Sequence, residues 1–350
     1  MFYRKLAKPL LFRLDPEDAH NLLFRSLQRF QTSRRLLRSV ERVLGVSGRD
    51  NGTLSRHCSG LYFPNPVGLA AGFDKNAALI PALTAAGFGF LEIGSITATP
   101  HAGNPRPRMF RLPDDEALIN RMGLNNKGAA YIMQKMREYH LSSPIPLGIN
   151  IAKTPLSYNS TEESIQDYVK SYRAAAKGSD YITLNISCPN TGDGKSFEDP
   201  ELFDALLQAV ASCRTKKQPL FVKFSSDTDD QRLSALLEIA EAYEVNGYIA
   251  VNTSNRRDGL KTPADQLRSI GKGGLSGRPL AETAVSRITL IRRQVRPERT
   301  LISVGGIMSP AEAARRLDAG ADLIQLYTGL VYEGPGLPGR ISRFLQNRES

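Results

Sequence analysis

Cysteine is scarce in this sequence: Cys58, Cys188 and Cys213 are the only three among 350 residues. An odd number of cysteines without Cys-x-x-Cys spacing excludes a disulfide framework and a structural zinc site. We therefore expect a reducing environment such as the cytosol. The sequence also lacks an HExxH motif and a paired-carboxylate arrangement. This argues against metal-dependent hydrolysis and glycosidase chemistry, and we predict no metal site.

Long hydrophobic runs are missing as well. No apolar stretch reaches the roughly 18 residues that a membrane-spanning helix needs, so no span is expected. The first residues lack the apolar core and the small-residue cleavage site of a secretory signal, and we expect no export signal. The core itself has ample material, because 41% of the 350 residues are hydrophobic, enough for one large α/β domain.

The net charge is +11, and it is unevenly distributed. Residues 1–42 contain ten basic and four acidic residues, which gives this segment alone a net charge of +6. A charge concentrated at one end favours a segment that docks on an anionic surface over a nucleic-acid footprint across the whole domain. We therefore expect no nucleic-acid partner.

Residues 1–42 show the pattern of two short helices. Apolar residues recur at helical spacing from Phe2 to Leu14, among lysines and arginines. Asp15-Pro-Glu-Asp18 then predicts a helix start, with an aspartate N-cap, proline at the first helical position and acids in the first turn. Two interpretations remain open: a helical pair packed on the main domain, or a basic amphipathic pair lying on a membrane interface. We interpret residues 43–60 as a linker and residues 61–350 as the main domain.

The main domain alternates between strand-like and helix-like segments. Eight strands that alternate with helices predict a parallel sheet, and this number suits a closed (β/α)8 TIM barrel, with an open doubly wound sheet as the alternative. The proline-rich insert 98–145 is expected to be largely loop. The predicted strands are Pro66–Gly72, Phe90–Thr97, Leu147–Ile151, Tyr181–Ile186, Leu220–Phe224, Tyr248–Asn252, Leu301–Val304 and Leu323–Tyr327. The predicted helices are Ala77–Ala86, Thr161–Lys177, Pro200–Cys213, Asp229–Tyr243, Leu280–Arg293 and Pro310–Ala319.

Polar residues stand at nearly every predicted strand end. Because the carboxyl ends of barrel strands meet at one rim, we expect these side chains to form a single ligand site. Most of them are Asn, Ser and Thr, which hold a flat ligand by hydrogen bonds, while two lysines would attract an anionic ring or a carboxylate. These ends read Ala71–Lys75, Gly94–Ser95, Asn150, Asn185–Asn190, Lys223, Asn252–Thr253, Gly305–Gly306 and Tyr327–Thr328.

Glycine-rich turns follow the late strands, at Gly273–Gly277, Gly305–Gly306 and Tyr327–Gly329. Backbone N–H groups at such positions bind phosphate in many barrels, so we predict a phosphate site there. Cys188 is the one good candidate for proton transfer on the rim, since nearby cations can lower the pKa of a thiol. The alternative is that this cysteine is a small buried residue.

Four longer motifs resemble the dihydroorotate dehydrogenase family, and the resemblance covers almost the whole chain. The N-terminal motif is similar to that of the class 2 branch, whose members associate with membranes and reduce quinone. The motifs are Leu11-Phe-Arg-Leu-Asp-Pro-Glu-Asp-Ala-His20, Asn65-Pro-Val-Gly-Leu-Ala-Ala-Gly-Phe-Asp-Lys75, Asn120-Arg-Met-Gly-Leu-Asn-Asn126 and Gly273-Gly-Leu-Ser-Gly-Arg-Pro-Leu280.

The resemblance implies an FMN-containing barrel that oxidises dihydroorotate to orotate in pyrimidine synthesis, with electrons passed to a membrane quinone. The FMN-binding residues that it implies are Ala71, Gly72, Phe73, Asp74, Lys75, Ser95, Asn150, Asn185, Lys223, Val251, Gly277, Gly306, Tyr327 and Thr328. The implied substrate-binding residues are Lys75, Asn120, Arg121, Met122, Gly123, Leu124, Asn185, Asn190, Asn252 and Thr253. The implied quinone site contains His20, Arg111 and Tyr327.

The chain departs from the class 2 pattern at the catalytic base. Class 2 members have serine where this chain has Cys188, and cysteine at that position is the pattern of the soluble class 1 branch. The resemblance implies that Cys188 is the base. We still expect quinone as the acceptor, because residues 1–42 would have little purpose in a soluble enzyme. The expected protein is a monomer bound peripherally to the cytoplasmic face of a bacterial inner membrane.

Three alternatives remain open. The first is dihydroorotate oxidation with a soluble acceptor. The second is another flavin barrel, such as a dihydrouridine synthase that acts on tRNA, although its separate basic RNA-binding domain is missing. The third is a membrane-docked binding protein without catalytic activity.

Overall fold

The computed structural model describes residues 3–44, 46, 52–156, 158, 160–187, 196–215 and 217–349. Eight described strands are parallel and almost entirely buried, which explains why their sequences are continuous apolar runs. They are β3 (Val67–Leu69), β4 (Phe90–Ile96), β7 (Leu147–Ile151), β8 (Tyr181–Asn185), β9 (Leu220–Lys223), β10 (Gly247–Ala250), β12 (Thr300–Val304) and β13 (Leu323–Leu326). They close into a barrel in the order β10-β12-β13-β3-β4-β7-β8-β9, which confirms the predicted TIM barrel.

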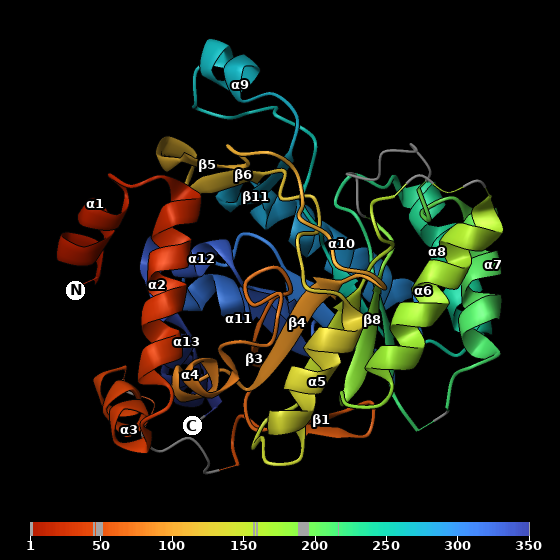
Figure 1. Ribbon diagram of the computed structural model, residues 1–350, viewed down its shortest axis with the longest axis horizontal. Helices are drawn as coiled ribbons and strands as arrows, with labels where there is room; N and C mark the ends of the chain where they lie inside the picture. Colours follow the sequence, from red (N-terminus) through yellow and green to blue (C-terminus); the bar gives the residue numbers. More distant parts are fainter. Residues whose placement is uncertain are drawn as a thin grey trace.

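Helices between the strands cover the outside of the barrel (Figure 1). All six predicted helices are present, and two further long helices, α5 and α13, were not predicted. The helices from α4 onwards are α4 (Ile80–Ala85), α5 (Ala129–His140), α6 (Thr161–Ala175), α7 (Pro200–Ala211), α8 (Asp230–Ala242), α9 (Ala264–Ile270), α10 (Ala281–Gln294), α11 (Pro310–Asp318), α12 (Thr328–Glu333) and α13 (Leu337–Glu349). Short 3-10 turns span Pro113–Asp115 and Arg278–Leu280.

The insert 98–145 is more ordered than expected. It contains the hairpin β5 (Met109–Leu112) and β6 (Ala117–Asn120), as well as α5. β6 also pairs with β11 (Gly274–Gly277), so a three-stranded antiparallel sheet lies beside the carboxyl rim of the barrel (Figure 1). The expectation of a loop was wrong here because Pro100, Pro105 and Pro107 lie before the hairpin and Pro113 lies in its turn, so none of them removes a donor from its strands.

A second hairpin closes the amino end of the barrel. It consists of β1 (Arg56–Cys58) and β2 (Leu61–Phe63), and β1 lies within the range that the sequence marks as a linker. The buried ring of Phe63 packs edge-on against Phe90, with 5.3 Å between ring centroids. The described side chains therefore fill the barrel interior at this end, and the open pocket lies at the carboxyl rim.

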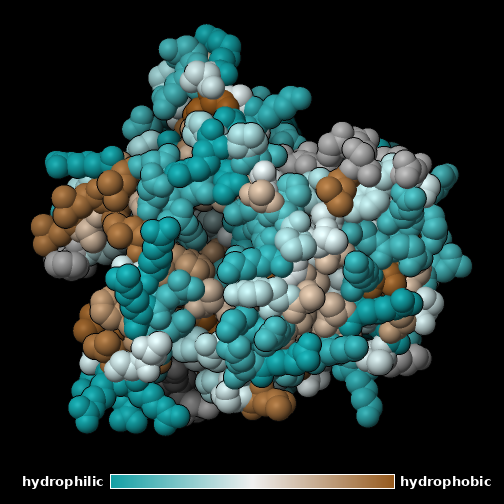
Figure 2. All heavy atoms as spheres, in the orientation of Figure 1, coloured by the Kyte–Doolittle hydropathy of each residue, from teal (hydrophilic) through white to brown (hydrophobic). Residues whose placement is uncertain are grey.

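The N-terminal extension contains a π-helical turn (Tyr3–Ala7) and the helices α1 (Lys8–Leu11), α2 (Pro16–Phe30) and α3 (Arg34–Val43). Asp15 caps α2 as the sequence predicts, since its carboxylate accepts hydrogen bonds from the backbone N–H groups of Glu17 and Asp18. Hydrophobic side chains gather on the exposed surface over α1 and along α2 (Figure 2). Within the described residues, none of the helices combines the length and the hydrophobicity needed to cross a membrane.

Candidate active site

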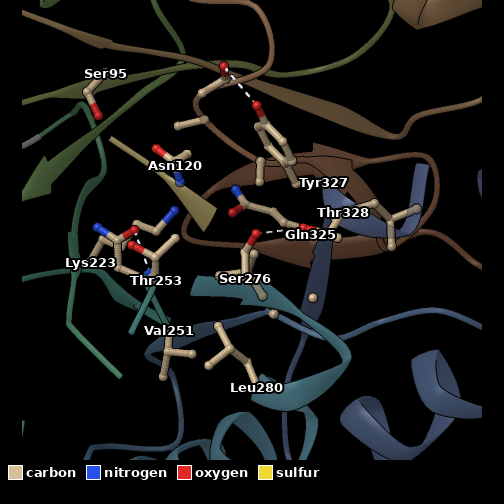
Figure 3. A pocket seen from close by; sticks show the side chains of 18 of the residues that line it. Ser95, Asn120, Lys223, Val251, Thr253, Ser276, Leu280, Gln325, Tyr327 and Thr328 are labelled. Atoms are coloured by element: carbon tan, nitrogen blue, oxygen red, sulfur yellow. Dashed lines mark hydrogen bonds between the residues drawn. The ribbon is translucent and has the colours of Figure 1, made fainter. Parts of the chain in front are cut away.

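A pocket of about 1120 Å3, open solvent at its mouth included, lies at the carboxyl ends of the barrel strands. Such a volume suits a cofactor together with a small substrate, because ligand pockets measure about 300–1,000 Å3. Figure 3 shows side chains from several strand ends pointing into it. The wall is formed by Ala70, Ala71, Gly72, Lys75, Ser95, Asn120, Met122, Gly123, Leu124, Asn185, Lys223, Val251, Asn252, Thr253, Ser276, Gly277, Leu280, Val304, Gly305, Gly306, Ile307, Gln325, Leu326, Tyr327, Thr328 and Gly329.

Two lysines line the pocket without a hydrogen-bond or ion-pair partner among the described residues. Lys223 ends β9 and is only 5% exposed; burial lowers its pKa, and the carboxylate of Glu92 opposes that shift. Burial also lowers the pKa of Lys75 to about 8; Arg108 acts in the same direction and Glu17 opposes it. Lys223 is buried and Lys75 is partly buried, and an amine removed from water without a partner is costly, so this pair indicates an anionic or hydrogen-bond-accepting ligand.

Polar side chains on β4, β7 and β8 and just after β10 are linked by hydrogen bonds at the edge of the pocket. Ser95 on β4 donates to Asn150 Oδ1 on β7, and Asn185 Nδ2 on β8 donates to Ser95 Oγ over 3.0 Å. Asn252, just after β10, donates from Nδ2 to Asn185 Oδ1 over 3.1 Å. Each amide is therefore held in one position, as a site for a flat ligand requires.

The opposite side of the pocket is built from glycine-rich backbone. A Cβ atom on Gly306 would lie 2.7 Å from the backbone nitrogen of Ala281, and one on Gly277 would lie 2.4 Å from Glu116 O. Both positions therefore need glycine, because the backbone of one turn lies directly against the next. Behind this edge, the buried Arg316 donates from Nη2 to Gly305 O over 3.0 Å. Arg316 also pairs with Glu312 over 2.7 Å, so the glycine backbone is the feature that suits a phosphate group.

The segment Asn120–Leu124 forms another wall and is held in place by the loop between β4 and β5. Asn104 Nδ2 donates to Arg121 O over 2.8 Å, and His101 Nδ1 lies 2.9 Å from Gly123 O. His101 therefore positions the backbone of this wall.

An aromatic row joins the pocket to α2. The ring of Tyr327, which follows β13, packs edge-on against Phe73 at 5.9 Å between centroids, and Phe73 packs edge-on against His20 at 5.3 Å. Burial lowers the pKa of His20 to about 4, and Lys75 acts in the same direction. The imidazole is therefore neutral at physiological pH and extends an uncharged path from the pocket towards the helices.

Arg111 lies on β5 and contacts the N-terminal extension. Its guanidinium is 4.6 Å from the ring centroid of Phe12, and its Nη1 donates to Leu14 O over 2.8 Å. Phe12 in turn packs edge-on against Tyr332 of α12, with 5.5 Å between centroids. The residues assigned to a quinone site by resemblance therefore lie between the pocket and the N-terminal helices.

Four of the predicted binding residues do not line the pocket. Asp74 is fully buried and accepts hydrogen bonds from the backbone N–H groups of residues 76, 78 and 79, so it shapes the loop after β3. Asn150 lies one layer behind Ser95, and Phe73 faces α2. Arg121 points away, because its Nη1 donates to Lys272 O and its guanidinium covers the ring of Phe110. Cys188 and Asn190 lie outside the described residues.

The pocket also contains polar residues that the sequence did not single out. Ser276 Oγ lies 2.9 Å from Thr328 Oγ1, and both side chains face the cavity (Figure 3). Gln325 is buried in the middle of β13, and its Oε1 atom lacks a hydrogen-bond partner among the described groups. A glutamine within the apolar run Leu323–Leu326 was the available signal for this position.

A family model described as Dihydroorotate dehydrogenase matches residues 53–348. The chain belongs to the dihydroorotate dehydrogenase family. Members of this family are flavoenzymes, which agrees with a pocket built for a flat, anionic ligand.

Individual relatives extend the match beyond the barrel. A protein of Chloroflexus aurantiacus named dihydroorotate dehydrogenase (quinone) is 42% identical over 98% of this chain and 96% of its own length. Relatives of the same name from Salinispora arenicola and a Nocardioides species are 42% and 43% identical. These two alignments cover 96% and 95% of this chain, and 97% and 94% of the respective relatives. An alignment over 98% of the chain necessarily includes most of the N-terminal extension.

Solved structures support the same assignment. The crystal structure of Eimeria tenella DHODH in complex with ferulenol has a TM-score of 0.79 at 30% identity, covering 95% of this chain and 91% of that one. The ligand-free form from the same organism gives 0.77 at 30% identity, covering 90% of this chain and 94% of that one. The similarity therefore includes both the barrel and the extension.

Proposed function

We propose that this protein is a dihydroorotate dehydrogenase (quinone), which oxidises dihydroorotate to orotate in pyrimidine biosynthesis and uses a quinone as the electron acceptor. The observation that carries the proposal is the nearly full-length match to relatives of that name, at 42% identity over 98% of the chain. The pocket supports it, because buried cations, amides and a glycine-rich edge meet at the carboxyl rim of a barrel.

The residues present fit FMN as the flavin. The Gly277 and Gly306 turns form a backbone cradle for its phosphate, and Arg316, which is paired with Glu312, holds the backbone at Gly305 behind them. Lys223 and the unpaired Oε1 of Gln325 supply a cation and an acceptor for the polar edge of the ring. When bound there, FMN would supply the redox chemistry: hydride acceptance for oxidation at C6 of dihydroorotate and electron transfer to a quinone.

Dihydroorotate carries a carboxylate and two amide-like edges, and the pocket offers matching groups. Lys75 provides the cation for the carboxylate, while the backbone of Met122–Leu124 closes one side of the ring. Asn120, Asn185 and Asn252 supply side-chain amides that pair with the carbonyl and N–H groups of the substrate. Thr253 completes the wall, and we propose Asn190 as a further contact from the segment after β8.

Proton removal from C5 of the substrate needs a base beside the ring. We propose Cys188 for this role; it follows Ser187, whose Oγ donates to Asn185 Oδ1 over 3.1 Å. A thiolate requires a pKa below that of an ordinary thiol, and the two pocket lysines are cations of the kind that lower it. Serine occupies this position in the class 2 branch, so the cysteine sets this chain apart.

The quinone is proposed to reach the flavin between α2 and the barrel, where His20, Arg111 and Tyr327 lie. His20 is neutral and Phe73 is apolar, so this passage suits an apolar molecule. Exposed leucines and basic side chains on residues 1–42 fit peripheral docking on an anionic membrane surface. We propose a monomer on the cytoplasmic face of a bacterial inner membrane.

Anaerobic addition of dihydroorotate to the purified, FMN-loaded protein tests this function. The proposal predicts that the flavin absorbance bleaches and that orotate forms, and that a quinone in lipid vesicles restores the absorbance. A flavin that stays oxidised in the presence of dihydroorotate contradicts the proposed substrate. Bleaching without recovery by quinone contradicts the proposed acceptor and favours a soluble one.

A further inference from the structure

Glu92 is a fully buried carboxylate in the middle of β4, and the proposed chemistry does not yet use it. Its partners come from β7, β8 and β13, although β8 and β13 are not neighbours of β4 in the barrel. The side chain therefore points into the barrel interior, where these strands face one another. A buried carboxylate is costly unless several donors hold it, so its retention calls for a reason.

Every hydrogen-bond partner of Glu92 is a donor. Its Oε1 accepts from Asn150 Nδ2 over 2.8 Å, and its Oε2 accepts from Gln325 Nε2 over 2.8 Å and from Thr183 Oγ1 over 3.3 Å. Gln325 lines the pocket directly, whereas Asn150 reaches it through Ser95. Glu92 thus touches the pocket wall at two points without lining it.

An ionised carboxylate can only accept hydrogen bonds, and this fixes the direction of everything attached to it. Asn150 must turn its amino group towards Glu92, so its carbonyl oxygen faces Ser95. The Ser95 hydroxyl gives its single hydrogen to that oxygen and can then only accept from the next residue. Asn185 must therefore present Nδ2 to Ser95, which it does over 3.0 Å.

The same order continues to the pocket. With its amino group directed at Ser95, Asn185 turns Oδ1 outward, where it accepts from Asn252 Nδ2 over 3.1 Å and from Ser187 Oγ over 3.1 Å. An asparagine amide or a serine hydroxyl can exchange its donor and acceptor positions by a simple rotation. Without a fixed end, the hydrogen bonds of this chain could therefore all point in either direction. Glu92 is the end that permits one direction only.

We propose that Glu92 is a positioning residue that fixes the direction of the amide chain Glu92–Asn150–Ser95–Asn185–Asn252, and so determines which donor and acceptor atoms meet the substrate. The inference rests on the proposed function, in which Asn185 and Asn252 hold dihydroorotate. A simpler alternative is that Glu92 serves only as a counter-ion for the Lys223 ammonium. In that case Glu92 would not depend on Asn150 and Ser95 to affect the pocket.

Glu92→Gln tests this directly, because glutamine has the same shape but can donate as well as accept. The chain then has two directions of similar energy, and charge-assisted hydrogen bonds are lost. We expect the dissociation constant for orotate, measured from the change in flavin absorbance of the FMN-loaded protein, to rise about 10- to 100-fold. The matched control is Glu241→Gln, a carboxylate that accepts from Tyr248 Oη over 2.6 Å and from Arg299. It is expected to change the thermal midpoint but not the orotate affinity.

Asn150→Leu separates the chain from the charge, because it interrupts the chain and leaves the Glu92 carboxylate near Lys223. The proposal expects the same loss of orotate affinity as in Glu92→Gln. In the Ser95→Ala background the chain is already broken, so adding Asn150→Leu should cost less than about twofold more. If the losses of orotate affinity in Ser95→Ala and Asn150→Leu multiply in the double variant, the inference is wrong. An unchanged orotate affinity in Asn150→Leu also overturns it.

The design also distinguishes failure of the inference from failure of the proposed function. If the wild-type protein binds no orotate and dihydroorotate does not bleach its flavin, the function itself is refuted. If the wild type binds orotate and is bleached by dihydroorotate, and Glu92→Gln binds orotate with the same affinity, only the role of Glu92 is refuted. Should Glu92→Gln not fold, the cycle of Ser95→Ala and Asn150→Leu carries the test, since the proposal again requires non-additive losses.

Discussion

The rim pocket and the N-terminal helices differ in which side chains they bury. The pocket buries a charged side chain, whereas the helices expose large apolar ones. Inside the pocket, Lys223 is 5% exposed and none of the described residues pairs with it. On the helices, Leu10 is 62% exposed and Leu22 and Phe30 are each 53% exposed. Unpaired buried charge and exposed apolar clusters are both unfavourable. The pocket therefore calls for a polar or anionic ligand, and the helices call for an apolar surface.

In contrast to the pocket lysines, acidic residues of α2 form ion pairs with arginines of the main domain. Glu17 Oε1 accepts from Arg108 Nη2 over 2.8 Å, and Arg106 Nη2 donates to Asp18 Oδ1 over 2.7 Å. Acidic side chains thus attach α2 to the barrel, while Leu22 and Leu23 of the same helix are exposed. The two regions suit two half-reactions: oxidation of the substrate in the pocket and delivery of electrons beneath the helices.

The largest expected effect concerns the proposed base in the pocket. Cys188→Ala should slow reduction of the flavin by dihydroorotate by roughly 10²–10⁴, because general-base catalysis contributes about that much. Rapid-mixing absorbance measurements without oxygen give this rate. Cys188→Ser should retain part of the activity at higher pH. An alanine variant that reduces the flavin at the wild-type rate would remove Cys188 from the mechanism.

Lys75→Met should weaken orotate binding by about 10- to 100-fold, because it removes a charged hydrogen-bond donor. The thermal midpoint of the ligand-free protein should stay the same or rise, since an unpaired amine is removed. The exposed Lys127 provides the matched control, and Lys127→Met should leave the orotate affinity unchanged. A loss of affinity accompanied by an equal loss in the control would show a general charge effect instead.

The pocket should also respond to pH through Lys75. Its pKa of about 8 means that the ammonium form predominates below pH 8 and is lost as the pH rises further. The groups that act on it are Arg108, Glu17 and Asp74. Orotate affinity should therefore fall by about tenfold per pH unit above the pKa, as deprotonation of one group requires. Titrations at several pH values should show this slope in the wild type and a flat profile in Lys75→Met.

The helices should respond to substitutions that leave the pocket intact. Leu6→Glu with Leu10→Glu should reduce binding to anionic lipid vesicles by about tenfold or more, because each leucine loses its favourable transfer into an apolar phase. Sedimentation with vesicles measures the bound fraction. Leu141→Glu is the control, since Leu141 is 95% exposed on the barrel side, at the end of α5. Equal losses in both proteins would mean that the N-terminal face is not the docking surface.

The smallest effect is expected where the two regions meet. Glu17→Gln weakens the contact with Arg108, whose Nη1 also donates to Asn104 O over 2.9 Å in the loop behind the substrate wall. We expect a two- to fivefold rise in the KM for dihydroorotate, which corresponds to roughly 0.5–1 kcal/mol. Steady-state kinetics check it, with the exposed Glu138→Gln as control. An unchanged KM would mean that the two regions work independently.

The sequence predicts the barrel well because each strand is a buried apolar run that ends at a polar residue. Lys75, Asn185 and Lys223 meet in one pocket for this reason. The helix Ala129–His140 was missed although Ile132, Met133 and Met136 have helical spacing, since the prolines of the insert dominated the interpretation.

Side-chain direction was harder to predict than position along the chain. Asn150 is the penultimate residue of β7 and Asn185 is the last residue of β8, yet Asn150 points into the barrel core because Glu92 and Ser95 bind the two ends of its amide. Arg121 stands between pocket residues, but Phe110 and the backbone near Lys272 draw it away. Such choices depend on partners that are distant in the sequence, which a strand pattern does not reveal.

One measurement tests the division between the two regions most directly. Flavin absorbance is followed by anaerobic rapid mixing, first with dihydroorotate and then with vesicles that contain quinone, in Lys75→Met and in Leu6→Glu with Leu10→Glu. The pocket variant should bleach slowly and recover normally, whereas the helix variant should bleach normally and recover slowly. If both variants slow the same step, the assignment of one half-reaction to each region is contradicted.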